Sequence, residues 1–302
     1  MTITAIILLL ISAFTHAGWN LLGKRNDPTA ASFLVAIITG TLCFFPFLVV
    51  YRMSLGLFSL RVWLFVIGAG CFQTIFYTAL VGAYQTGDLS IAYPLARSSP
   101  VIMVMVVNFL LGRKDQISWQ CIWGMVLIVG GGLLLPMKRF SDFRLQNYRN
   151  LSCLLALLAA VGTTGYSLID DAALRLLRQT PGILLPSWEI TLLYAFFEAV
   201  TSSFWLSLVV CGRKREREIL RKVITTSLHP AAFMGIGIGL AYTLALISMA
   251  FVTNVSYVVA FRQLSIPLGV ILGASILKEP STLPKFAGVT VMFVGLALVG
   301  TG

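Results

Sequence analysis

Three ionisable residues stand inside long apolar stretches, where a charge is costly unless something compensates it. Arg97 lies within GDLSIAYPLARSSPVIMVMVVNFLLG (87–112), Arg262 lies in a similar stretch further along, and Glu198 lies within LLYAFFEAVTSSF. An arginine in the middle of a bilayer costs ~3 kcal/mol, so its side chain should face a bundle interior or a watery cavity. Guanidinium groups can bind carboxylate, phosphate and phosphonate oxygens in a bidentate manner. Two guanidinium groups against one carboxylate leave one positive charge over, so these residues predict a cavity that attracts anions.

The same residues also fit other roles. Either arginine can hydrogen-bond to backbone carbonyls of a broken helix or pair permanently with Glu198, because buried ion pairs are often structural. Glu198 is in addition a candidate for proton coupling, because ionisable groups inside membranes often form proton relays. The sequence leaves these roles open beside anion binding.

Polar and aromatic residues on other apolar stretches could line the same cavity. His16 and Asn20 are four positions apart and share one face of a helix, with Trp19 close by. For a single tyrosine or tryptophan, packing or an interfacial belt is the commoner role, and for His16 it is a helix–helix hydrogen bond. Together with the two arginines, the predicted substrate-binding residues are His16, Trp19, Asn20, Tyr77, Tyr93, Tyr166 and Tyr242.

Other residues near these stretches are given plainer roles. We expect Asp170 and Asp171 to be solvated charges at the end of a helix, paired with Arg175 or Arg178. Prolines remove a helical hydrogen bond and kink a helix. They are expected to interrupt the two arginine-bearing helices, at Pro94, Pro100 and Pro267.

The elements that must position these residues are membrane-spanning helices. Of the 302 residues, 58% are apolar and only 11% are charged, which is too few polar residues to cover a soluble protein. Runs of about 20 apolar residues, each long enough to cross a bilayer as a helix, recur along the chain. We therefore predict an all-α polytopic membrane protein with ten spans, and a short amphipathic surface helix within 212–229. The spans are roughly 2–22, 30–50, 62–84, 88–111, 118–136, 150–171, 187–211, 230–251, 254–277 and 283–301.

An internal repeat divides these spans into two halves. At an offset of 165 positions, Tyr77 aligns with Tyr242 and Arg97 with Arg262. Five spans per half is an odd number, so the second half should enter the membrane from the opposite side, as in inverted-repeat transporters with a midplane site. We predict a first repeat over 1–140, a charged connecting loop over 137–149 and a second, inverted repeat over 150–302.

Composition and spacing also exclude several classes. The excess of 22 Lys and Arg over 11 Asp and Glu lies mostly in loops, where it suits anionic lipid head groups; no motif supports nucleic-acid binding. With two histidines and no dense carboxylate cluster, we expect no catalytic residues, no metal site and no cofactor. The expected partners are a small-molecule substrate and membrane lipids. Small residues one heptad apart permit close packing within each half or between the protomers of a homodimer, at Gly124/Gly131 and Gly288/Gly295.

The repeat also carries a family pattern. The chain resembles the drug/metabolite transporter superfamily, specifically its EamA-type ten-helix members, in three stretches: YTALVGAYQTGDLSIAYPLARSSPV, QCIWGMVLIVGGGLLL and SILKEPSTLPKFAGVTVMFVGLALVG. The resemblance implies this fold and transport, but no particular substrate. Family members are usually drawn with cytoplasmic termini, whereas more loop Lys and Arg lie on the side opposite the termini, which favours external termini.

These observations lead to one functional prediction with two alternatives. The chain is predicted to move a small anionic or zwitterionic metabolite, such as an amino acid, organic acid or phosphate or phosphonate compound, by alternating access. The alternatives are a flippase for a lipid-linked phosphate and, more weakly, an intramembrane enzyme. We expect an integral protein of a bacterial plasma (inner) membrane that exports or imports its substrate.

Overall fold

The described part of the chain is helical, with no strand among its residues. The computed structural model describes residues 1–302 except 24–28, 52–55, 57, 87–88, 138, 141–148, 183–184, 277 and 279–281; the side chains of 19–23 and 89–93 also lie outside the described residues. The α-helices are α1 (Ile3–Gly23), α2 (Ala30–Tyr51), α3 (Leu60–Thr86), α4 (Leu89–Leu110), α5 (Trp119–Leu134), α6 (Leu151–Gln179), α7 (Ser187–Gly212), α8 (Lys214–Thr226), α9 (Leu228–Ser248), α10 (Val255–Phe261), α11 (Ser265–Ile276) and α12 (Leu283–Thr301). Short 3-10 helices lie at η2 (Lys114–Gln116), η5 (Met249–Phe251) and η6 (Arg262–Leu264).

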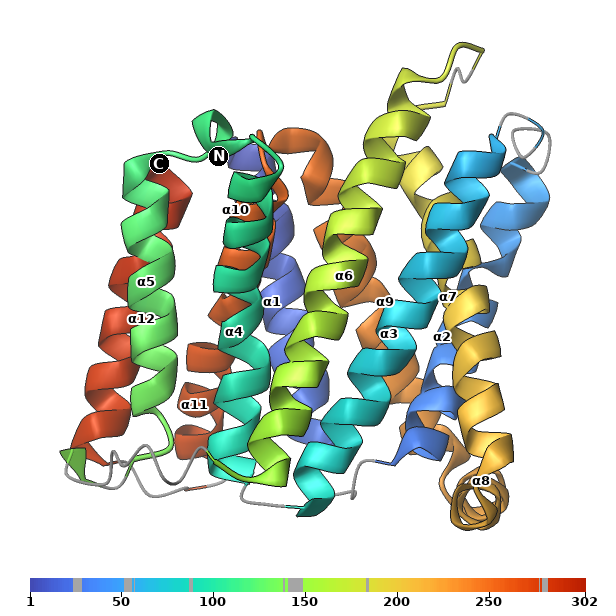
Figure 1. Ribbon diagram of the computed structural model, residues 1–302. Coiled ribbons are helices and arrows are strands. Elements are labelled where there is room, and N and C mark those ends of the chain that lie inside the picture. The colour runs from blue at the N-terminus through green and yellow to red at the C-terminus, as the bar shows by residue number, and fades with distance from the viewer. Residues whose placement is uncertain are drawn as a thin grey trace.

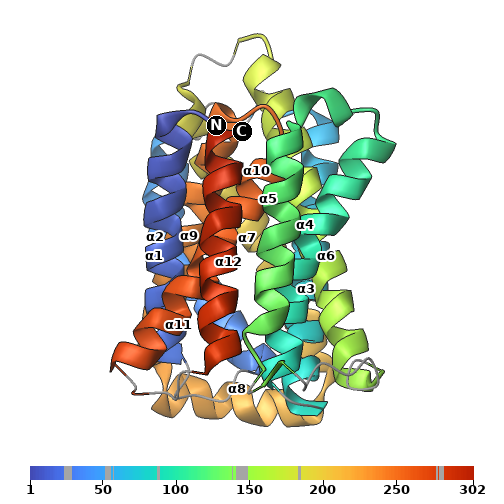
Figure 2. The same cartoon turned by 90° about the vertical axis from the view of Figure 1, so that its left-hand side faces the viewer.

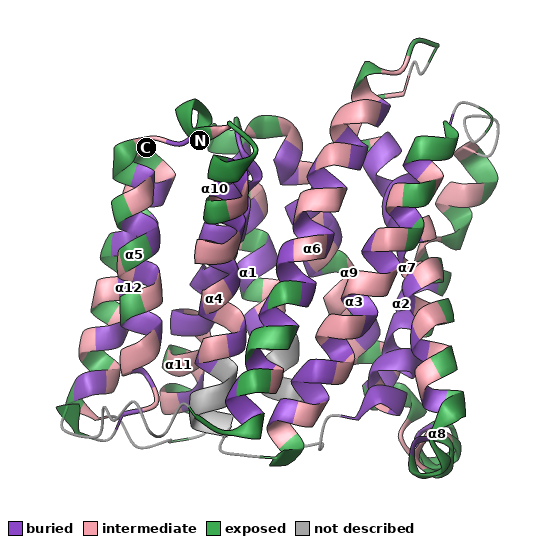
Figure 3. Ribbon diagram, in the orientation of Figure 1, coloured by how far each residue is buried: buried purple, intermediate pink, exposed green. Residues whose placement is uncertain are grey.

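The outer surface of the bundle is apolar, as expected for a chain that spans a membrane. Large aliphatic side chains point outward, for example Leu60 (75% exposed) and Leu110 (81% exposed), and exposed positions run along the outer helices (Figure 3). Within the described residues, 7 helical segments are long and apolar enough to cross a bilayer, and three further apolar helices are shorter. The predicted all-helical membrane class is thereby confirmed, while the ten-span arrangement stays a prediction.

Two elements differ from the sequence prediction in an informative way. Helix α6 continues to Gln179 instead of ending at 171, so Asp170 and Asp171 lie inside a helix and not at its end. The second arginine-bearing helix is broken where Arg262 begins the 3-10 turn η6 between α10 and α11. Pro267 follows η6 and cannot donate a helical hydrogen bond to the carbonyl of Gln263, which accounts for the irregular turn. Helix α4 contains Pro94 and Pro100 yet runs without a break.

The helices pack in a reciprocal pattern across the chain. Helix α1 packs on α9 and α3 packs on α6; α2 packs on α9 and α3 on α7; α4 packs on α6 and α1 on α11. The two contacts in each of these pairs are equivalent. If every helix is replaced by its counterpart in the other half of the sequence, one contact of the pair becomes the other. The contacts α2·α7 and α5·α12 each join two helices that are counterparts of one another, so the same replacement leaves them unchanged. Both halves therefore contribute to one shared interior.

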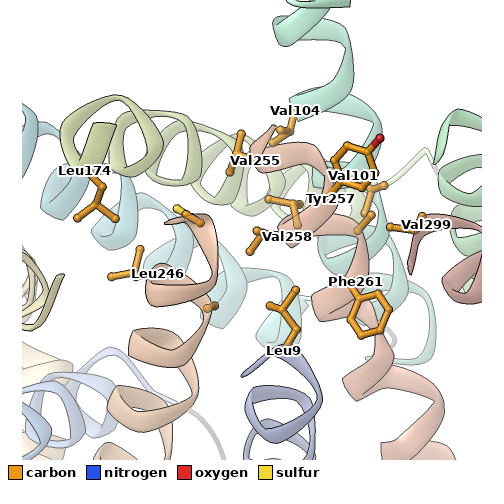
Figure 4. Close-up of a cluster of buried hydrophobic side chains, with 14 of the residues drawn as sticks. Leu9, Val101, Val104, Leu174, Leu246, Val255, Tyr257, Val258, Phe261 and Val299 are labelled. Atoms are coloured by element: carbon orange, nitrogen blue, oxygen red, sulfur yellow. The ribbon is translucent and has the colours of Figure 1, made fainter. Parts of the chain in front are cut away.

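The two ends of the bundle are built differently. Both termini lie at one end, whereas α8 lies across the opposite end (Figures 1 and 2). A large cluster of buried apolar side chains includes Leu9 of α1, Leu246 of α9 and Val258 of α10, which point toward one another in Figure 4. At the other end α8 is fastened to α2, because the backbone N–H of Ala31 donates a 2.9 Å hydrogen bond to the buried carboxylate of Glu216.

Four glycines allow α5 and α12 to touch backbone to backbone. A Cβ atom added to Gly124 would lie 2.6 Å from the carbonyl oxygen of Gly295, and one added to Gly131 would lie 2.7 Å from that of Gly288. Such distances are too short for any side chain, so only glycine fits. These small residues therefore form a seam between the two halves of one chain, which differs from both predicted alternatives, packing within each half and packing between protomers.

Candidate functional site

A cavity of about 110 Å³ lies at mid-depth of the bundle, with walls from α1, α2, α3, α4, α6, α7, α9 and η6. Its lining residues fall near the midpoints of their helices, among them Gly40 in α2, Gln73 in α3, Tyr166 in α6, Ala199 in α7 and Gly239 in α9. Space of this size holds several water molecules or one small solute. The walls are mostly apolar, with a few polar groups, which is the usual composition of a small-molecule site.

The two arginines meet on the wall of this cavity. Arg97 of α4 and Arg262 of η6 both line it, and both also line a smaller void of about 10 Å³ beside it. The Arg97 Nη2 group donates a 3.0 Å hydrogen bond to Ser265 Oγ, which lies 3.0 Å from the backbone oxygen of Arg262. The Nε atom of Arg97 is buried without a hydrogen-bond partner. No salt bridge in the described part of the chain involves either guanidinium group.

Aromatic side chains make up much of the remaining wall. The guanidinium of Arg262 lies 5.4 Å from the ring centroid of Tyr242, within the range of a cation–π interaction. The ring of Tyr166 meets that of Tyr242 edge-on at 5.7 Å, and Phe76 meets both Tyr166 and Tyr77. A flat solute with one charged end would find a cation and several ring faces in one place.

Two carboxyl groups lie directly behind this wall. Glu198 of α7 and Asp170 of α6 are both fully buried (0% exposed), and neither lines the cavity itself. The Tyr242 hydroxyl contacts both: it lies 2.8 Å from Glu198 Oε1 and is also hydrogen-bonded to Asp170 Oδ2. Tyr194 donates to Asp170 Oδ1 at 2.7 Å, and the side-chain amide of Gln73 donates to Glu198 Oε1. Glu198 is therefore held by a phenol and an amide, and not by an arginine.

The burial of Asp170 corrects two expectations. Asp170 and Asp171 are not solvated end charges, because α6 carries both into the bundle. Asp171 does pair with Arg175, at 2.9 Å, and it also accepts from Arg113 at 3.5 Å. The sequence predicts two buried guanidinium groups and one buried carboxyl group near the cavity. That count is wrong as well, because Asp170 is a second buried carboxyl group. Its spacing was a usable signal, since Asp170 lies four positions after Tyr166 and so shares its helix face.

The structure brings six of the predicted binding residues to one cavity and leaves three undescribed. The cavity lining includes His16, Tyr77, Arg97, Tyr166, Tyr242 and Arg262. The side chains of Trp19, Asn20 and Tyr93 lie outside the described residues. Prediction from sequence missed Phe44 and Phe76 in the wall, and Ser265, which positions Arg97. Among the described residues no group of three His, Cys, Asp or Glu side chains could hold a metal ion.

Comparisons with known proteins agree with this fold. No curated protein matches the chain significantly. Of the solved structures, 28 chains match; one of them, titled "Crystal structure of protein", has a TM-score of 0.70 and 14% identity, over 98% of this chain and 97% of that chain. At this identity the likeness concerns the fold alone. Residues 3–137 match the model of the EamA-like transporter family. The resemblance seen in the sequence is thus confirmed over residues 3–137, which match the EamA-like transporter family, a part of the drug/metabolite transporter superfamily.

Proposed function

We propose that this membrane transporter carries a small anionic or zwitterionic metabolite by alternating access. The solute would bind between two inverted halves. The observation that carries the proposal is the meeting of Arg97 and Arg262, from opposite halves, on one mid-depth cavity. Neither guanidinium has a carboxylate partner in the described part of the chain. A carboxylate, phosphate or phosphonate group would provide the bidentate acceptor that both lack.

The inverted five-plus-five arrangement is part of the same proposal. It is supported by the reciprocal packing of first-half and second-half helices. It is also supported by direction, since α1 runs away from the end that holds the termini whereas α6 runs toward it (Figure 1). In such carriers the halves rock about a site near the midplane. The repeats would be 1–140 and 150–302, joined by 137–149, in a bacterial plasma membrane.

Different groups would have different tasks at the site. Arg97 and Arg262 would bind the anionic group, while the rings of Tyr77, Tyr166 and Tyr242 would pack against the rest of the solute. His16 lies within electrostatic reach of both arginines and would add a hydrogen-bonding group. Trp19, Asn20 and Tyr93 stay predictions from the sequence. Glu198 would serve proton coupling from behind the wall, because Tyr242 connects it to the cavity.

A ligand screen by thermal unfolding tests the proposal. Ligand binding to the folded state raises the apparent melting temperature, and the rise grows with the logarithm of the ligand concentration above Kd. We expect benzoate, sulfate or a phosphonate to stabilise the wild type, and Arg97→Gln and Arg262→Gln to lose this effect. Arg61→Gln is the matched control, because Arg61 also stacks on a ring, 5.6 Å from the centroid of Phe65, but is exposed outside the cavity. Stabilisation by lipophilic cations alone would contradict the proposal, and stabilisation by a polyprenyl phosphate alone would favour a lipid-linked phosphate flippase.

A further inference from the structure

Three side chains behind the cavity wall share too few hydrogens for their contacts. The Tyr242 hydroxyl oxygen is within hydrogen-bonding distance of Asp170 Oδ2 and of Glu198 Oε1. A tyrosine hydroxyl carries one hydrogen and can donate it to one acceptor only. If both carboxyl groups were ionised, one of the two contacts would be a pair of oxygens with no hydrogen between them.

One added proton completes this hydrogen-bond chain. A proton on Asp170 Oδ2 would be donated to the Tyr242 oxygen, and the Tyr242 hydrogen would then be donated to Glu198 Oε1. Tyr194 already donates to the other oxygen of Asp170, Oδ1, and Gln73 donates to Glu198 Oε1, the same oxygen that faces Tyr242. With that proton every contact has one hydrogen and one acceptor, which is what buried polar groups require.

A second observation also indicates uncompensated negative charge. The other oxygen of Glu198, Oε2, is buried and has no hydrogen-bond partner. An ionised carboxylate oxygen left without a donor inside a protein is unfavourable, and two neighbouring carboxylates make it more so. A group of this kind binds a proton more readily than an isolated, fully hydrogen-bonded carboxylate does.

The surrounding charges connect this group to the cavity. Arg262 stacks on the ring of Tyr242 and faces both the cavity and the carboxyl groups. The other titratable or charged groups that face the three side chains are Asp171 from α6, Tyr194 from α7 and Tyr77 from α3, with Tyr166 on α6 and, across the cavity, His16 on α1 and Arg97 on α4. Arg262 is therefore the cation shared by the carboxyl groups and by any bound anion.

We propose that Asp170, Tyr242 and Glu198 form a single proton-binding unit that takes up one proton when an anion binds at Arg262. The inference rests on the proposed function and extends its proton coupling from Glu198 alone to a three-residue unit that binds one proton per anion. An anion at Arg262 offsets the positive charge that favours ionised carboxyl groups, so the proton and the anion favour each other's binding. With one proton bound, the unit keeps one negative charge, and Arg97 and Arg262 carry two positive charges. The net charge near the cavity is then a single positive charge, which a bound monoanion would neutralise. The proton comes from the aqueous solution on one side and leaves with the substrate on the other, so the transport would be symport.

The coupling is tested by measuring benzoate binding to the purified protein in detergent between about pH 6 and about pH 9, where a carboxylate probe stays ionised. The affinity should rise about tenfold for each pH unit lowered across the range in which the unit titrates, as expected for one linked proton. In weak buffer, a pH indicator should report uptake of one proton per benzoate. Infrared difference spectra taken without benzoate should show one protonated carboxyl group that titrates with pH.

Matched variants locate the proton. Asp170→Asn and Glu198→Gln should abolish the infrared band or its titration and make benzoate affinity independent of pH. Asp115→Asn and Glu218→Gln are the controls, because both side chains are exposed and far from the cavity in the fold, and they should behave as wild type. Proton uptake that survives both core variants but vanishes in His16→Gln would overturn the proposal.

The wild type alone keeps the proposal falsifiable if a core variant fails to fold. Benzoate binding with no proton uptake and no pH dependence would overturn the coupling and leave the anion site standing. A titrating carboxyl band together with no binding of benzoate or sulfate at any pH would instead contradict the proposed function. Absence of both the band and the uptake would overturn the proton-binding unit itself.

Discussion

The guanidinium of Arg97 donates a 3.0 Å hydrogen bond to the hydroxyl of Ser265, which belongs to the opposite half of the chain. Ser265 is also bonded to the backbone carbonyl of Arg262, so one hydroxyl fixes the positions of both arginine-bearing segments. The Arg97 guanidinium is thereby held against the backbone of the Arg262 segment by a neutral residue, and neither guanidinium group has a salt-bridge partner in the described part of the chain. This arrangement keeps the charge of both available at the cavity.

Replacing this serine should weaken anion binding. In Ser265→Ala the Arg97 side chain loses its partner across the halves, so we expect a ~3–10-fold weaker benzoate affinity and a loss of about 1 kcal/mol in stability. Binding titrations and thermal unfolding measure the two effects. Ser275→Ala is the control, because Ser275 is exposed on the same helix and bonds only to Ile271. Equal affinities in both variants would show that Ser265 does not position the arginine.

The seam between α5 and α12 should tolerate no added methyl group. Gly131→Ala would bring a Cβ to 2.7 Å from the Gly288 carbonyl oxygen, and we expect ~1–3 kcal/mol of destabilisation, as for other overpacked contacts. Gly130→Ala on the same helix is the control, because nothing lies within 4 Å of its added Cβ. Thermal unfolding should separate the two variants, and similar melting temperatures would contradict the seam.

The polar contacts near the termini should hold that end closed. Asp171 accepts from Arg113 and Arg175, and Arg175 also donates to the backbone oxygen of Thr253 at 2.9 Å. Asp171→Asn should lower the free energy of unfolding by about 1–3 kcal/mol, which is less than for a fully buried pair because both arginines are about a third exposed. Hydrogen exchange of peptides covering 249–264 should become faster. The exposed Asp115→Asn variant at the same end should leave exchange unchanged, and unchanged exchange in both variants would count against this closure.

The contact between α8 and α2 should contribute to stability. Glu216 accepts from the N–H of Ala31 in the first turn of α2, where a negative charge also interacts favourably with the helix dipole. Glu216→Ala should lose ~1–2 kcal/mol, whereas Glu218→Ala, two positions further on the exposed face, should lose little. Thermal unfolding of the two variants at equal salt concentration gives the comparison. A smaller loss for Glu216 than for Glu218 would be inconsistent with this role.

The convergence of the arginines could be predicted from the sequence, because the internal repeat aligns Arg97 with Arg262 and, read as inverted, predicts similar depths for both. The helix ranges were also close, since apolar length largely determines where a spanning helix lies. The start of α10 has a local signal as well, because the Asn254 side chain, a common helix cap, accepts from the N–H of Ser256 at 2.9 Å.

The role of Asp170 could not be predicted from hydropathy. A hydropathy criterion ends a span at the first charged residues, but α6 continues for eight residues past 171 because partners on other helices compensate its charges. Those partners, Tyr194 and Tyr242, lie 24 and 72 positions away along the chain. The spacing from Tyr166 indicates only that Asp170 shares its helix face, whereas its contacts depend on how α6 packs against α7 and α9.

The glycine seam also bears on how the two halves can move. Backbones that touch at Gly124/Gly295 and Gly131/Gly288 can rotate against each other but have little room to separate. In Figure 1, α5 and α12 stand at one edge of the bundle, and α2 and α7 stand at the opposite edge. A rotation about the seam would therefore leave α5 and α12 nearly in place. It would displace α2, α7 and the attached α8 most, because these helices lie farthest from the axis of rotation.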